Sequence, residues 1–147
     1  MKSLLVISMF FVVLGLPATA SDQVRFVQRV YVAGEPVVMD MATGLMWQGN
    51  YVTQKTWQQA LAYCEGLNYG GFSDWRLPNI NELKSLINYN KDVPASDFPN
   101  MPPDWFWSSS SVSGGSDGAW GVDFDYGGVY YGDAGHHSDA RCVRLRP

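Results

Sequence analysis

The fold is decided by the stretch Gly70-Gly71-Phe72-Ser73-Asp74-Trp75-Arg76-Leu77-Pro78-Asn79-Ile80-Asn81-Glu82-Leu83. Its two glycines permit backbone conformations that other residues avoid. The residue before a proline favours extended geometry, so the chain up to Leu77 is predicted to be strand-like or irregular. Asn79, with Glu82 three residues later, predicts a capping box that begins a helix. The stretch therefore ends one element and begins another.

Four residues of this corner are predicted to be structural, namely Trp75, Arg76, Pro78 and Glu82. A tryptophan in such a place is usually part of the core, and such an arginine usually pairs with a buried carboxylate or carbonyl. The alternative is that Trp75 and Arg76 face a ligand.

Residues 1–20 read as a secretory signal, and residues 21–147 as one domain. Lys2 precedes the apolar run Leu4–Leu16, and Pro17–Ala20 supplies the small residues of a cleavage site near Ala20. The run is short for a membrane span, although an uncleaved anchor is the alternative. We expect a secreted, periplasmic or cell-surface protein that has no membrane insertion after cleavage.

The composition is acidic. Without Lys2, the chain has 9 basic and 14 acidic residues, a net charge of about −5. This balance argues against nucleic acids and anionic membranes as partners.

Cys64 and Cys142 are the two cysteines of the chain. In an exported protein, two cysteines most simply form one disulfide. A reactive thiol or a metal pair is the alternative, although the sequence has no C-x-x-C motif and no histidine near Cys64.

Two helices are predicted. Thr56 and Gln59 form a capping-box pattern, and the helix from there to Leu67 places one apolar face inward, made of Trp57, Ala60, Leu61, Cys64 and Leu67. A second helix is predicted from Pro78 to about Tyr89.

Extended segments are predicted on both sides of the helices. They lie within 21–35, at 36–40 and 45–48 as a hairpin, and at 105–111, 119–124 and 141–145. Phe98 and Met101 are expected to anchor the loop 88–103, because a long unanchored loop is unusual in a compact domain. Residues 125–140 are predicted to be a loop.

Five motifs in order resemble one family, the Lcl C-terminal domain family. They are Thr43–Trp47, Thr56–Cys64, Trp75-Arg76-Leu77-Pro78 with Glu82 and Leu83, Phe106–Ser110, and Arg141–Arg144. The resemblance covers roughly residues 38–145. It implies an α+β, C-type-lectin-like fold related to formylglycine-generating enzymes, with two helices, small antiparallel sheets and paired N- and C-terminal strands. The inferred disulfide suits that fold.

The resemblance implies a secreted binding module, in some members an adhesin. Calcium-dependent lectins of related fold use a carboxylate-Pro-Asn or similar motif, whereas this chain has Phe98-Pro99-Asn100 and no Trp-Asn-Asp. Formylglycine-generating enzymes need reactive or copper-binding cysteines, which here are expected to be structural. We therefore expect no catalysis, metal or cofactor.

Residues 125–140 carry the predicted ligand site. They combine Tyr, Gly, Asp, His and Ser, a mixture that antibody paratopes also use. The candidate contacts to a protein or glycan are Trp105, Asp125, Tyr126, Tyr130, Tyr131, Asp133, His136 and His137.

The same stretch is similar to the variable region of diversity-generating-retroelement proteins. In similar sequences it is often nearly all Asn, and changing adenines in an Asn codon gives Asp, Tyr, His, Ser, Gly or Ala. The alternative is an ordinary polar loop. A metal site at His136 and His137 with Asp133 and Asp139 is disfavoured, because adjacent side chains of an extended segment point to opposite sides. The Ser-rich run has no nucleophile-elbow pattern.

Three functions remain open at this point. The first is an adhesin-like binding module, the second a relative of the formylglycine-generating enzymes, and the third an envelope structural domain with no ligand of its own.

Overall fold

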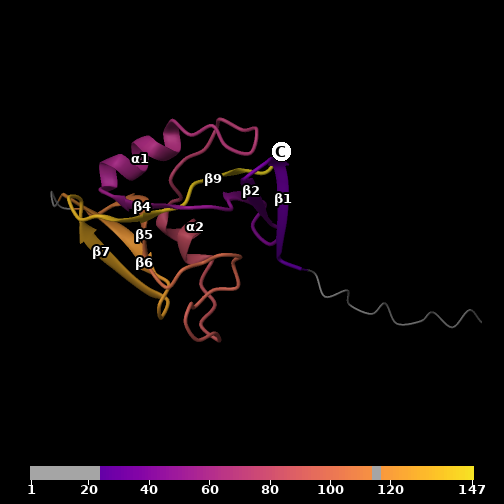
Figure 1. Cartoon of the computed structure of the whole chain (residues 1–147). Helices are drawn as coiled ribbons and strands as arrows, with labels where there is room; N and C mark the ends of the chain where they lie inside the picture. The colour runs from indigo at the N-terminus through magenta and orange to yellow at the C-terminus, as the bar shows by residue number, and fades with distance from the viewer. Residues whose placement is uncertain (1–23, 114–116) are drawn as a thin grey trace, which may run out of the picture.

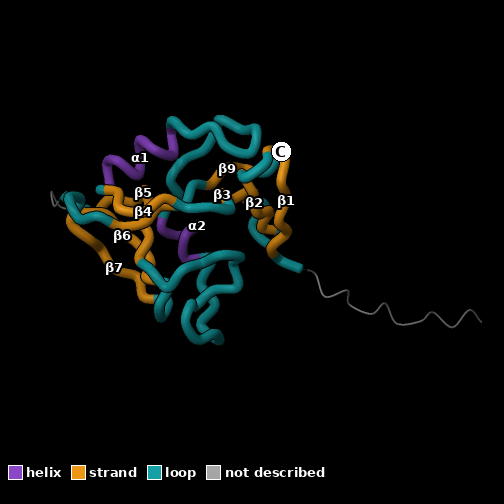
Figure 2. The backbone as a smooth tube through the Cα atoms, in the orientation of Figure 1, coloured by secondary structure: helices purple, strands orange, loops and turns teal. Residues whose placement is uncertain are grey.

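The computed structural model describes residues 24–113 and 117–147, which form two sheets and two helices (Figure 1). The predicted signal segment lies outside the described residues. In Figure 2 the four-stranded sheet lies to the right and the five-stranded sheet to the left. No helix in the described ranges is long and apolar enough to cross a membrane.

The four-stranded sheet has the order β1-β2-β3-β9, and all its neighbours are antiparallel. Its strands are β1 (Phe26–Val32), β2 (Glu35–Asp40), β3 (Leu45–Gln48) and β9 (Val143–Leu145). The predicted hairpin of β2 and β3 is confirmed, and its turn contains Gly44 with a φ of 72°. The expected pairing of the N- and C-terminal strands is wrong for the described residues, because β9 pairs with β3 and not with β1.

The five-stranded sheet has the order β4-β8-β5-β6-β7. Its strands are β4 (Val52–Lys55), β8 (Ser138–Ala140), β5 (Trp105–Ser111), β6 (Gly118–Asp123) and β7 (Gly128–Asp133). The β5–β8 pair is parallel and the other pairs are antiparallel, so this sheet is mixed rather than purely antiparallel as expected.

The prediction of a loop at 125–140 is wrong. Residues 128–133 form β7, which pairs with β6 from Gly118 to Asp123, and residues 138–140 form β8, which lies between β4 and β5. The strand was not recognised because its Tyr and Gly residues lack an apolar alternation, while its backbone pairing depends on a distant partner. The short strand β4 was also not predicted.

Both predicted capping boxes are confirmed. Helix α1 (Trp57–Glu65) begins at Thr56 with Gln59 as its partner, and α2 (Ile80–Lys84) begins at Asn79 with Glu82. However, α2 has five residues and does not continue to Tyr89. The amide of Leu86 already bonds the carbonyl of Leu83 three residues back, so the chain tightens out of the α-helical pattern.

The helices cover opposite faces of the five-stranded sheet. Adjacent residues of a strand point to opposite faces, and on β5 Trp107 packs with the α1 residues Ala60 and Cys64, whereas Phe106 packs with Leu83 of α2. We call these the α1 face and the α2 face. Phe98 and Met101 are buried in the core on the α2 face, so the loop 88–103 is anchored as predicted.

Cys64 and Cys142 form the predicted disulfide, and both are fully buried. The bond joins α1 to the residue before β9 across a sequence separation of 78. In the chain-entropy account, closing such a loop stabilises the fold by roughly 4 kcal/mol.

The corner at Trp75 and Arg76 joins α2 to the four-stranded sheet. Trp75 is buried and donates from Nε1 to the Tyr69 carbonyl at 3.0 Å. Arg76 makes two hydrogen bonds of 2.7 Å to the Glu82 carboxylate, and its backbone exchanges hydrogen bonds with Val143 of β9. The structure therefore places these residues in contacts that hold the fold.

Candidate functional site

Trp105 begins β5 on the α1 face and lies across two glycines. A Cβ at Gly121 would overlap the Trp105 ring, and a Cβ at Gly132 would meet it at 3.3 Å. Glycine inside a strand commonly marks such a close approach. The inner edge of the ring packs on Trp107, with ring centroids 4.5 Å apart at an angle of 82°. Trp105 is thus held in place while remaining partly exposed.

Tyr130 lies beside Trp105 on the same face, because both Trp107 and Tyr130 are directly opposite Gly121 in the sheet. Its ring lies over Gly128, and the side chain is 59% exposed. A pocket of about 370 Å³ is lined by Trp105, Tyr130, Tyr131, Gly132, Asp133 and His136. We call it the Trp105 pocket.

The connection from β7 to β8 crosses the α1 face. These two strands are separated in the sheet by β5 and β6, and the Trp57 amide at the start of α1 donates to the Ala134 carbonyl at 3.0 Å. The turn is closed by the amides of Gly135, to the Asp133 carboxylate, and of His136, to the Asp133 carbonyl.

A second pocket of about 410 Å³ lies on the other side of this connection. It is lined by Thr53, Gln54, Asp104, Trp105, His137, Ser138 and Asp139, and we call it the Asp139 pocket. Trp105 belongs to both pockets. The consecutive His136 and His137 line one pocket each, as adjacent side chains of an extended segment would.

Asp139 has the most strongly shifted pKa among the residues that line these two pockets. Burial raises its pKa to about 6, and repulsion from Asp104 adds to the shift. The amide of Gln54 and the charge of Arg141 act in the opposite direction but do not cancel it.

The predicted site residues are only partly brought together. Five of them surround the Trp105 pocket, and His137 lies in the Asp139 pocket. Asp125 and Tyr126 belong to neither pocket. They lie in the turn before β7, where a Cβ at Gly127 would meet Ile87 and Tyr89 of the neighbouring loop. That turn is a separate surface.

Sequence reasoning missed Asp104, Gly121 and Gly132, and considered Asp139 only as a metal ligand. The available signal was the two glycines near tryptophans and tyrosines in the sequence. Gly121 lies in a predicted strand, and Gly132 lies in β7, which was not predicted. Nothing local marked Asp104, since its neighbourhood depends on the pairing of β5 with β8. Within the described ranges, no group of three or more His, Cys, Asp or Glu residues is arranged to hold a metal ion.

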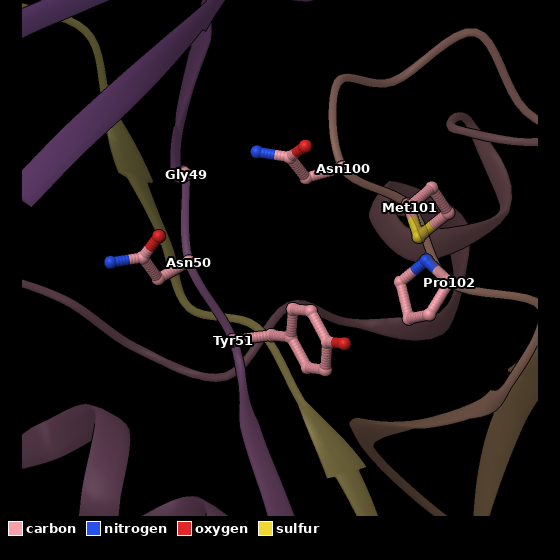
Figure 3. Close-up of a pocket in the computed structure, with 6 residues that line it drawn as sticks. All are labelled: Gly49, Asn50, Tyr51, Asn100, Met101 and Pro102. Carbon is pink, nitrogen blue, oxygen red and sulfur yellow. The ribbon is translucent and has the colours of Figure 1, made fainter.

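A third, polar pocket of about 640 Å³ lies apart from these two (Figure 3). Gly49, Asn50 and Tyr51 form one wall, from the segment between β3 and β4, and Asn100, Met101 and Pro102 form the other. Arg141 joins the two walls through hydrogen bonds to Gly49 and Asn100.

Arg141 is fully buried behind this pocket. Its guanidinium donates to the carbonyls of Gln48, Gly49 and Asn100 at 2.7–2.9 Å and lies over the ring of Phe98. Burial lowers its pKa to about 10, so it remains charged at neutral pH. These contacts give Arg141 a structural role in closing the two loops.

Fold and site together define a disulfide-linked α+β domain with an aromatic surface pocket. The model of the Lcl C-terminal domain family matches residues 36–144, which is most of the chain. The chain therefore belongs to the Lcl C-terminal domain family, as its motifs predicted. Comparison with curated proteins gave no match.

Proposed function

We propose that this protein is a secreted, non-catalytic, adhesin-like module that binds a protein or glycan through the Trp105 pocket. The observation that carries the proposal is the indole of Trp105, fixed over Gly121 and Gly132 beside the exposed Tyr130. Preorganised aromatic rings offer a large contact area at little cost in conformational entropy, for a protein ligand as well as for a glycan.

The neighbouring exposed side chains support a binding surface. Asp133 and His136 face solvent beside the pocket. The ring of Tyr131, which is 66% exposed, packs against Trp120 on the α2 face instead, with ring centroids 5.8 Å apart. Large aromatic side chains grouped at a surface are typical of recognition sites.

The cysteine chemistry supports a non-catalytic role. A formylglycine-generating reaction would need a free or metal-bound thiol, whereas Cys64 and Cys142 are joined to each other in the core. The enzyme alternative has a direct test, which is alkylation of the native protein followed by mass spectrometry. Labelling of either cysteine without prior reduction would favour the enzyme.

A screen against arrays of cell-surface proteins and glycans tests the binding function. We expect a ligand that binds the wild-type protein and is lost on Trp105→Phe or Tyr130→Ala, while Tyr89→Ala, an exposed tyrosine outside the pocket, binds normally. Equal binding by all variants would refute the site. Absence of any ligand would favour an envelope structural role.

We further propose a C-type-lectin-like fold and an origin by retroelement diversification. Support for the origin comes from the varied stretch itself, in which six predicted contacts are exposed, namely Tyr126, Tyr130, Tyr131, Asp133, His136 and His137. The neighbouring DNA tests it. A reverse-transcriptase gene and an adenine-rich near-copy of the 3′ end are expected, and their absence would contradict active diversification.

A further inference from the structure

Among the described residues, the buried carboxylate of Asp139 has no ion-pair partner, and the Gln54 amide is the hydrogen-bonding group that acts on it. Only 7% of its surface is exposed, yet it lines a pocket that opens to solvent. None of the ion pairs among the described residues includes it. Buried charges in proteins are normally paired, since removing an unpaired charge from water is costly.

Arg141 does not act as an ion-pair partner of Asp139. Arg141 lies close enough to act on Asp139 through space, but its guanidinium is already held by the carbonyls of Gln48, Gly49 and Asn100. Asp104, on the same pocket wall, adds a second negative charge rather than a compensating one. His137 is the remaining titratable group that faces the pocket.

The third component of the pocket is Trp105. The face of an indole attracts cations, and this attraction grows where water is partly excluded. A carboxylate, a second acidic residue and an indole around one cavity of about 410 Å³ form an environment suited to a positive group. The net charge of −4 on the whole chain would attract a basic partner at long range.

We propose that the Asp139 pocket binds a lysine or arginine side chain of a partner protein. The inference rests on the proposed function, because the Trp105 pocket and the Asp139 pocket share Trp105. It narrows the ligand from a protein or glycan to a basic segment of a protein, whose cationic side chain enters beside Asp139 while its neighbours cover Trp105 and Tyr130.

Single amino-acid derivatives test the pocket directly. The purified protein is titrated with Nα-acetyl-lysinamide, Nα-acetyl-argininamide and the uncharged Nα-acetyl-norleucinamide, while NMR follows the indole N–H of Trp105, assigned with Trp105→Phe. Saturable shifts are expected with the two cationic probes, together with a fall in the pKa of the Asp139 carboxyl. Norleucinamide should cause no such shift. Equal shifts with all three would overturn the proposal.

The variant Asp139→Asn keeps the shape of the side chain and removes its charge. We expect it to weaken the cationic probes by about tenfold or more, the usual effect of losing one charge-assisted hydrogen bond. Asp92→Asn removes one charge from an exposed loop residue outside both pockets and should bind as the wild type does. Unchanged binding by Asp139→Asn would overturn the proposal, provided that its amide spectrum shows a folded protein.

The ligand found by the surface screen separates the two proposals. If Tyr130→Ala abolishes its binding and Asp139→Asn leaves it unchanged, the Trp105 pocket is a binding site and the assignment of the Asp139 pocket is wrong. If both variants bind normally, both proposals fail. If both lose binding, both are supported.

Discussion

The ring of Trp105 occupies the space that a side chain at Gly121 would need. A Cβ at residue 121 would also collide with the backbone carbonyl oxygen of Phe106, which cannot move without separating β5 from β6. Gly121→Ala is therefore expected to destabilise the protein by about 1–3 kcal/mol, the usual range for overpacking. Thermal unfolding followed by circular dichroism measures this change.

Gly135→Ala is the matched control for that variant. Its Cβ would meet only the Asp133 carboxylate oxygen, at 3.2 Å, and that side chain can move aside. If the two variants have the same midpoint, the fit of Trp105 on Gly121 does not contribute to stability.

The disulfide should account for a large share of the stability of the fold. Replacing both cysteines by alanine removes a crosslink between residues 78 apart in sequence, and we expect a loss of roughly 4 kcal/mol or more, since two buried side chains also become smaller. Urea unfolding of the variant and of the wild type, each with and without reductant, measures the loss. A reductant effect on the variant as large as that on the wild type would contradict the assignment.

Arg141→Lys should destabilise the protein even though the substitution keeps the positive charge. A lysine cannot reach the three carbonyls that the planar guanidinium joins, so Arg141→Lys leaves buried acceptors unpaired. We expect a loss of about 3 kcal/mol, typical of breaking a buried charged network. Arg146→Lys, at an exposed position, should change stability little, and urea denaturation of both variants compares them.

Asp139 should make stability depend on pH in an unusual direction. Its folded-state pKa of about 6 lies above its ordinary value of 3.8, so the folded protein binds more protons than the unfolded chain between these values. The contribution of this group is therefore favourable at low pH and is lost as the pH rises through about 6.

Asp139→Asn should remove this dependence. We expect the variant to be more stable than the wild type at pH 8, by an amount on the order of 1–3 kcal/mol, and no more stable at pH 4. Urea unfolding at the two pH values measures the difference, with Asp92→Asn as a charge-matched control. A stability advantage of the wild type that grew with pH would show that Asp139 is paired in solution.

Features that depend on local chemistry could be predicted from the sequence. Thr56 with Gln59 and Asn79 with Glu82 make their contacts within three residues, so their patterns identified the starts of both helices correctly. The turn at Gly44 and the disulfide were likewise predictable, since one is local and the other involves the two cysteines of the chain.

Features that depend on distant pairing could not be predicted in the same way. The strand β7 has two exposed tyrosines and three glycines or aspartates, and its identity comes from its partner β6. The Asp139 pocket depends on the parallel contact of Phe106 with Asp139, a pairing between residues far apart in the chain. The aromatic and histidine composition indicated a recognition surface, but it could not indicate that the two histidines face different pockets.

The C-terminus follows β9 in the four-stranded sheet, where the Arg146 amide bonds the Gly44 carbonyl, and β7 lies on the opposite side of the protein (Figure 1). The C-terminus therefore lies away from β7, whose residues line the Trp105 pocket. A C-terminal tag that couples the protein to a sensor surface or bead should leave both pockets facing the solution.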